Sequence, residues 1–448
     1  MTRCNRDPVL DRRTLLHWFA GSLSLAAWSG MLTGCAKDPV TGENTFVGMS
    51  EADEIRLDRS RSPYQFSSDY GQVQDAELNA YVNEVGLGMA HRSHRPKMPY
   101  SFRVVNAAYI NAYAFPGGSI AATRGILLEL ENEAQLAALL GHEIGHVNAR
   151  HAAEQAFKGT LASALLAGLS LAGSAAGYDG AATLLQNFGG LGAGLLLAHY
   201  SRDNEREADR LGMEYMTRAG YSPQGMVDLM QVLLRNGRSR PSAIEVMFST
   251  HPMSEERLET ARSLARGRYA RMESGRIGRE RFMDRTARLR SQQGVVAALQ
   301  NALKSLGEKK YHAVEENLQQ ALRSGADDYA ALVMMARFRL MEKRFREAAR
   351  YALHAVDVYP GEAQAHLVAA MALVRSNRFQ EALEHLDSYD HLLAGNPMVL
   401  FYRGLAMEKL QHREEAAHQY ILFLRRVRQG KEARYAYGRL LEWGYIRR

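Results

Sequence analysis

Apolar residues recur every three or four positions between residues 136 and 147, and this spacing predicts a buried helix. Such residues lie on one side of a helix with 3.6 residues per turn. Asn132 and Glu133 come just before the run, and an asparagine followed by an acidic first turn is typical of a helix start. The apolar residues that define the buried side are Leu136, Leu139, Leu140, Ile144 and Val147.

Two stretches that precede this helix have the alternation of β-strands. They cover residues 100–105 and 119–124, and the segment 111–118 between them ends in Pro-Gly-Gly, which forces a turn. A free strand edge in such a small sheet can bind an extended peptide through main-chain hydrogen bonds. A simple structural hairpin is the alternative interpretation.

A long apolar stretch follows the helix. Residues 161–198 are rich in Gly, Ala and Leu and contain one charged residue, Asp179. The uncharged halves are about 17 to 19 residues long and are interrupted by glycines, which is marginal for crossing a bilayer. We therefore expect a buried or membrane-leaning insertion rather than a membrane hairpin.

The last third of the chain repeats with a period of 34 residues. Three columns of similar residues stay in phase over four copies, with Val314 and Arg413 as departures. This period and register are typical of tetratricopeptide repeats, in which each copy is a pair of helices. The columns are Ala302, Ala336, Ala370 and Gly404; Tyr311, Phe345 and Phe379; and Ala348, Ala382 and Ala416.

Composition places the chain among ordinary globular proteins of two or three domains. Its 448 residues are 46% hydrophobic and 23% charged, and the net charge is +7. Such mild basicity gives no reason to expect a nucleic-acid partner. Residues 266–290 hold nine arginines, and we expect a solvated, partly helical linker there rather than a phosphate-binding segment.

The amino terminus has the three parts of an export signal. A basic region ends in Arg12 and Arg13, an uncharged stretch follows, and Leu-Thr-Gly-Cys ends at Cys35. This ending resembles a lipoprotein cleavage motif with lipid on Cys35; a plain membrane anchor or a non-lipidated signal are the alternatives. Both the general secretory and the twin-arginine routes fit. Ala36 favours sorting to the outer membrane, and the only other cysteine, Cys4, leaves no disulfide in the mature chain.

The predicted buried helix also carries the residues of a metal site. His142 and His146 lie about 40° apart around the helix, close enough to bind one ion, and Glu143 lies beside them. Burying such polar groups without partners is costly, and a metal ion is the simplest reason for them. His151 would lie on a different face of a continuous helix and has no assigned role.

A zinc site of this kind needs a third protein ligand. The charged helical segment 200–209 offers Glu205 and Asp209, which are four residues apart and share a face, whereas Glu207 points elsewhere. Glu205 would bind the metal, and Asp209 would accept the ring N–H of a ligand histidine or take part in proton transfer. A solvated helix of alternating charge is the alternative.

These motifs together are similar to those of the zinc metallopeptidases related to HtpX and to the CAAX prenyl proteases. The lipoprotein start, residues 111–118 and the repeats narrow the resemblance to BepA-like periplasmic β-barrel assembly-enhancing proteases. The resemblance implies one Zn²⁺ per chain. The residues it implicates are the zinc ligands His142, His146 and Glu205, the catalytic residues Glu143 and Asp209, and, from a His-Pro-x-x-x-x-Arg segment, a regulatory fourth ligand His251 with a supporting Arg257.

We therefore expect an α+β, mostly α chain: a gluzincin-type zinc metallopeptidase domain with a small β-sheet, followed by an α-solenoid of tetratricopeptide repeats. The expected parts are a signal peptide (1–34), a tether (35–62), the metallopeptidase domain (63–265), a basic linker (266–293), the repeats (294–430) and a capping helix (431–448).

The function that follows is zinc-dependent endopeptidase activity in the bacterial periplasm, with the lipid at Cys35 holding the chain at the outer membrane. Misfolded or assembling envelope proteins would be substrates, and the repeats would dock these or the β-barrel assembly machinery. A repeat-based chaperone or adaptor with a latent protease site is the main alternative, and a metal hydrolase of non-peptide substrates is a third.

Overall fold

A computed structural model describes residues 35–37, 39–40, 42, 44–46, 48–155 and 200–447. The predicted signal peptide and the apolar stretch 161–198 lie outside these residues. The chain divides into two compact units, with residues 33–334 in one and residues 335–448 in the other. None of the helices in the described ranges combines the length and the apolarity needed to span a bilayer.

In the first unit, a short hairpin of β1 (Cys35–Lys37) and β2 (Asn44–Phe46) precedes helix α2 (Glu51–Ser68). The helix starts inside the range predicted to be a tether, because Ser50 and Asp53 form a capping box. Asp58 of α2 is buried and accepts a hydrogen bond of 2.9 Å from the backbone N–H of Ser119. This helix is therefore attached to the sheet.

The small sheet has three strands in the order β3, β5, β4. The strands β3 (Ser101–Val105) and β5 (Ser119–Thr123) match the two predicted stretches and pair in parallel, and β4 (Ala112–Ala114) pairs antiparallel with β5. The outer edge of β3 is capped, because Asn79 and Asn83 accept hydrogen bonds from its backbone N–H groups. Both asparagines belong to helix α3 (Ala76–Ala90).

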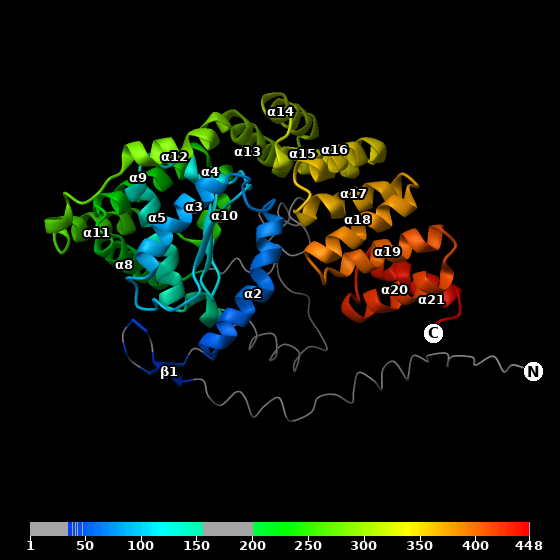
Figure 1. The fold of residues 1–448 in the computed structure, drawn as a ribbon, viewed down its shortest axis with the longest axis horizontal. Coiled ribbons are helices and arrows are strands. Elements are labelled where there is room, and N and C mark those ends of the chain that lie inside the picture. The colour runs from blue at the N-terminus through cyan, green and yellow to red at the C-terminus, as the bar shows by residue number, and fades with distance from the viewer. Residues whose placement is uncertain are drawn as a thin grey trace, which may run out of the picture. The chain divides into compact units, whose positions relative to one another are not determined.

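Helix α5 (Glu133–Asn148) is the centre of this unit, and all sixteen of its residues are buried. It contacts α3, α8 (Arg202–Arg218), α9 (Gln224–Ser239) and β4 (Figure 1). The short α4 (Arg124–Leu127), α10 (Pro241–Thr250), α11 (Glu255–Arg266) and the 3₁₀ turn η2 (Ala270–Met272) complete the surrounding layer.

Residues 266–293 are more ordered than the solvated linker that the sequence predicts. Helix α12 (Arg279–Ser291) contacts α3 and α5, and Phe282 is fully buried. Arg281 forms ion pairs with Glu84 of α3 (2.7 Å) and with Glu133, the first residue of α5 (3.1 Å). Four arginines of this segment therefore bind carboxylates of the same unit: Arg276, Arg279, Arg281 and Arg285.

The 34-residue period appears directly as helix pairs. The second helix of each pair starts at a column position, 34 residues after the previous one, and each pair turns at a residue with positive φ, again 34 apart: Lys309, Lys343, Asn377 and Gln411. The helices are α13 (Gln293–Gly307), α14 (Tyr311–Ser324), α15 (Tyr329–Met341), α16 (Phe345–Val358), α17 (Ala363–Arg375), α18 (Phe379–Leu392), α19 (Pro397–Lys409), α20 (Arg413–Arg426) and a final α21 (Lys431–Glu442) (Figure 1).

The small residues of the repeat columns have the expected packing role. Ala302, Ala336 and Ala370 are buried, and a Cβ added at Gly404 would lie 2.7 Å from the ring of Tyr420. The predicted fold class, a mostly helical α+β domain with a small sheet followed by helical repeats, is confirmed.

Glycines let the backbones of α5 and α8 approach each other. A Cβ at Gly145 would lie 2.8 Å from the carbonyl oxygen of Ala208, and a Cβ at Gly212 would lie 2.7 Å from the backbone nitrogen of His142. Both distances are shorter than van der Waals contact and involve backbone atoms, which side-chain rotation cannot relieve.

We expect Gly212→Ala to destabilise the first unit by about 1–3 kcal/mol, because the added methyl group forces the two helices apart. Gly88→Ala in α3 is the matched control, since its methyl group would meet nothing within 4 Å; it should be neutral or stabilising by up to about 1 kcal/mol. Thermal unfolding of the full chain checks both. Equal midpoints for the two variants would contradict the close-approach argument.

Candidate metal centre

Helix α5 carries the polar side chains of His142, Glu143 and His146 into the interior of the unit. Asn132 caps its first turn by accepting a hydrogen bond from the backbone N–H of Gln135 (2.9 Å), as the sequence predicts. The Nε2 atoms of His142 and His146 lie 3.0 Å apart. Because α5 is buried on every side, these imidazoles meet each other in the interior of the unit.

Helix α8 supplies the two predicted carboxylates. Ser201 caps this helix, and Glu205 in its first turn is fully buried. One carboxylate oxygen of Glu205 lies 3.2 Å from Nε2 of His146, and the other lies 3.6 Å from Nε2 of His142. Asp209, one turn later, accepts a hydrogen bond of 2.9 Å from Nδ1 of His142. The structure therefore brings together the groups that the sequence predicts to be close.

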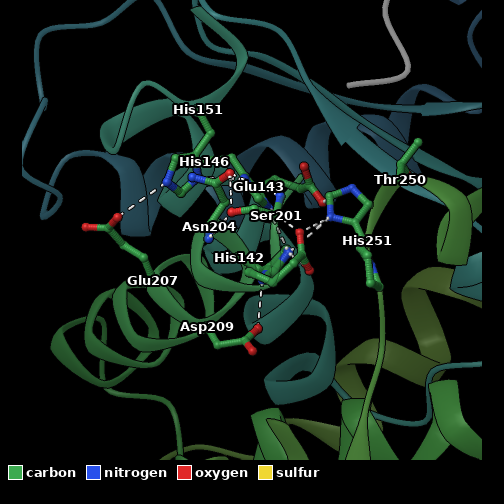
Figure 2. Close-up of polar contacts among 12 residues, drawn as sticks. His142, Glu143, His146, His151, Ser201, Asn204, Glu207, Asp209, Thr250 and His251 are labelled. Atoms are coloured by element: carbon green, nitrogen blue, oxygen red, sulfur yellow. Dashed lines mark hydrogen bonds and ion pairs between the residues drawn. The ribbon is translucent and has the colours of Figure 1, made fainter. Parts of the chain in front are cut away.

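His251 joins them from the end of α10. Its Nδ1 lies 3.0 Å from Glu205 Oε1 and 3.3 Å from His142 Nε2. His142, His146, Glu205 and His251 each offer one ligand atom, and these four atoms lie within 4.8 Å of one another (Figure 2). Three imidazole nitrogens and one carboxylate oxygen, all buried, form a donor set that fits a divalent metal ion such as Zn²⁺.

Arg257 of α11 binds the two carboxylates of α8, Asp209 and Glu205. It donates two hydrogen bonds of 2.7 Å to Asp209 and one of 2.6 Å to Glu205. Burial alone raises the pKa of Asp209, but the charge of Arg257 and the hydrogen bond from His142 outweigh it, so the pKa of Asp209 lies below its ordinary value. Asp209 is thus kept ionised and oriented as an acceptor for His142.

Glu143 has a different environment from the other two carboxylates. It is fully buried, and neither of its carboxylate oxygens has a hydrogen-bond partner among the residues that the structure describes. Burial raises the pKa of Glu143 above its ordinary value. The nearest ring nitrogen, Nε2 of His251, lies 3.9 Å from Oε1. A buried, unpaired carboxylate beside a metal-ligand cluster is available to exchange a proton with a bound molecule.

Sequence reasoning assigned no role to Tyr200, which the structure brings to the site. Its ring stacks on that of His146 with centroids 3.9 Å apart and an interplanar angle of 22°. Its backbone N–H donates to the carbonyl of Thr250, just before His251. Its position immediately before the Ser201 cap was the available signal, since the helix that supplies Glu205 begins there.

We expect Arg257→Lys to weaken Zn²⁺ binding by about 10- to 100-fold, because an ammonium group keeps the charge but cannot hold both carboxylates with a planar fork. Arg262→Lys, in the same helix, is the control, since Arg262 is partly exposed and forms an ion pair with Glu259 at the surface. Chelator competition on the full chain measures both affinities. If the Arg257→Lys variant binds Zn²⁺ with wild-type affinity, the planar guanidinium group of Arg257 is not needed for zinc binding.

Comparison with known proteins agrees with this geometry. The model of "Peptidase family M48" matches residues 76–265. The beta-barrel assembly-enhancing protease of Escherichia coli (strain K12) is 33% identical over 198 residues, which are 43% of this chain and 40% of that protein. A putative beta-barrel assembly-enhancing protease of Vibrio cholerae is 34% identical over 200 residues, with the same coverage. The match thus spans about two fifths of the length of these relatives.

Two further proteins are also similar to this chain. Metalloprotease YcaL of Escherichia coli is 26% identical over 260 residues, which are 54% of this chain and 94% of that protein. The crystal structure of YrrB, described as a TPR protein with an unusual peptide-binding site, overlaps 47% of this chain and 99% of that one, with a TM-score of 0.31 and 15% identity. The match to the model of peptidase family M48 includes α5, α8 and the His251 segment, so residues 76–265 of this chain are similar to that family over the whole metal centre.

Proposed function

We propose that the chain is a zinc-dependent endopeptidase. The observation that carries this proposal is the convergence of His142, His146 and Glu205 beside the buried carboxylate of Glu143, which has no hydrogen-bond partner among the described residues. The similarity of residues 76–265 to a peptidase family supports it, as do the printed names of the relatives, which are proteases.

Each residue has a separate part in the proposed reaction. Zn²⁺ held by these ligands would supply Lewis acidity, polarising the scissile carbonyl and making a water molecule more acidic. Glu143 takes the proton from the attacking water and returns it to the leaving amine. Asp209 holds His142 with its proton on Nδ1, so that Nε2 faces the ion.

An extended polypeptide fits the sheet beside the site. Because α3 caps the outer edge of β3, the edge that no other strand of the described residues pairs with belongs to β4, which contacts α5. A substrate strand added there would run past the helix that carries His142 and Glu143. This geometry supports peptides over small metabolites as substrates.

We infer the cellular role from the relatives and the sequence. The names of the most similar proteins connect them with β-barrel assembly, so the proposed substrates are misfolded or assembling envelope proteins. The repeats would dock these or the β-barrel assembly machinery. A lipid at Cys35 would anchor the chain to the outer membrane from the periplasm.

A latent protease that acts mainly as a chaperone or adaptor is the second candidate. Its support is that His251 stands where a fourth ligand would, because its Nδ1 lies 3.0 Å from Glu205 Oε1 and 3.3 Å from His142 Nε2. A fourth protein ligand would occupy the position that a catalytic zinc site leaves open for water or substrate.

Glu143→Gln should lower casein cleavage by about 10²- to 10⁴-fold, because an amide cannot accept the proton of the attacking water. Bound zinc, measured per chain by metal analysis, should stay at the wild-type level since the ligands are intact. Glu259→Gln, at the exposed surface of α11, controls for loss of a carboxylate. Proteolysis that persists in the Glu143→Gln variant would contradict the proposed role of Glu143. Full rescue of outer-membrane protein assembly by this variant would favour the adaptor.

His251→Ala should increase casein cleavage several-fold while one zinc ion stays bound, because two histidines and a glutamate still hold the ion and one position opens. Zinc content and cleavage are measured on the same preparation. A loss of zinc together with activity would instead make His251 an essential ligand rather than a regulatory one.

A further inference from the structure

His151 lies against His146, although the sequence predicts different faces for these two residues. The prediction assumed one continuous helix, and the helix ends at Asn148. Arg150 takes a left-handed conformation with φ of 58°, and a new helical segment starts at His151. This turn folds His151 back, so that its Nδ1 lies 2.9 Å from Nδ1 of His146.

The turn is held by buried ion pairs. A positive φ is unfavourable for a residue with a side chain and persists only where its surroundings fix it. Arg150 donates a hydrogen bond of 2.8 Å to Glu54 of α2, which is fully buried and also binds Arg95 at 2.5 Å. Arg95 in turn donates to the carbonyl of Val147 in the last turn of α5 (2.9 Å). The place of His151 is therefore set by helix α2.

If Nε2 of His146 binds a metal, only one assignment of the ring protons of His146 and His151 satisfies their contacts. A neutral imidazole that offers the Nε2 lone pair carries its proton on Nδ1. His146 then donates from Nδ1, and Nδ1 of His151 accepts. This leaves the proton of His151 on Nε2, which lies 3.4 Å from a carboxylate oxygen of Glu207 on α8. Figure 2 shows Glu207, His151 and His146 in this sequence, with the rings of the histidines side by side.

The same logic already holds for the other histidine of α5. The Nδ1 of His142 donates to Asp209, which Arg257 fixes. Stacking on Tyr200 limits the tilt of the His146 ring, but stacking does not select which nitrogen carries the proton. That selection requires an acceptor at Nδ1, and His151 is the acceptor that the structure provides.

We propose that His151, oriented by Glu207, is a positioning residue that holds His146 with Nε2 directed at the metal. This inference rests on the proposed function, because it requires that the cluster binds zinc. It also gives Glu207, which the sequence analysis left aside, a role on the second face of α8. A histidine that merely fills space would be replaceable by an apolar residue of similar shape.

Two variants of similar shape show whether His151 acts as a hydrogen-bond acceptor or only fills space. His151→Asn places an oxygen where Nδ1 stands, whereas His151→Leu has the same branching and no acceptor. We expect the leucine variant to bind Zn²⁺ about 10- to 100-fold more weakly than wild type and the asparagine variant to stay within about threefold. Chelator competition on the full-length apo protein gives the affinities, and the visible spectrum of the Co²⁺ form reports a changed ligand geometry in the leucine variant alone.

The controls keep each outcome decisive. His94→Leu removes another histidine of the first unit, one that contacts Tyr215 and not the cluster, and should leave zinc affinity unchanged. If His151→Leu does not fold, Glu207→Met tests the same proposal, because Glu207 lies near the surface and its replacement should not unfold the chain. We expect Glu207→Met to weaken zinc binding several-fold. Equal affinities for leucine and asparagine, or no effect of Glu207→Met, would overturn the inference. Absence of zinc binding in wild type would instead refute the proposed function.

Discussion

The structure depends on burying three imidazoles and three carboxylates where α5, α8 and the end of α10 meet. Desolvating such groups costs several kcal/mol each unless they are paired and hydrogen-bonded. Close approach of the helices at Gly145 and Gly212 makes the pairing possible, because it brings Glu205 within 3.2 Å of His146. Arg257 supplies positive charge from the outside of the cluster. A metal ion held by the ligand atoms would supply it from within.

Sequence reasoning succeeded where a short spacing determines the geometry. The four-residue spacings of His142 with His146 and of Glu205 with Asp209 place each pair on one helical face, whatever surrounds the helix. The 34-residue period likewise fixed the helix pairs, because each copy repeats its own turn. The family resemblance, and not the spacing, pointed to His251 and Arg257.

Sequence reasoning failed where contacts with residues far away in the sequence determine the local backbone conformation. His151 was placed by assuming that α5 continues, whereas buried Glu54, almost a hundred residues earlier, holds the turn at Arg150. The arginine-rich segment before the repeats suggested a solvated, partly helical linker; its helix α12 is present, but charge density gave no signal for what this helix contacts. Its Arg281 instead reaches Glu133 at the start of α5, a contact that no pattern within the segment contains.

The segment that carries His251 also explains how the cluster can open without falling apart. Arg257 donates to the carbonyl of Pro252, so the support for Asp209 and the residue that closes the site belong to one short stretch. Ser254 starts α11 between them by accepting a hydrogen bond from the backbone N–H of Arg257. A displacement of His251 would break the hydrogen bond from Arg257 to Pro252, whereas the hydrogen bonds from Arg257 to Asp209 and Glu205 come from within α11. The carboxylates on α8 would therefore keep their support if the fourth position were exposed.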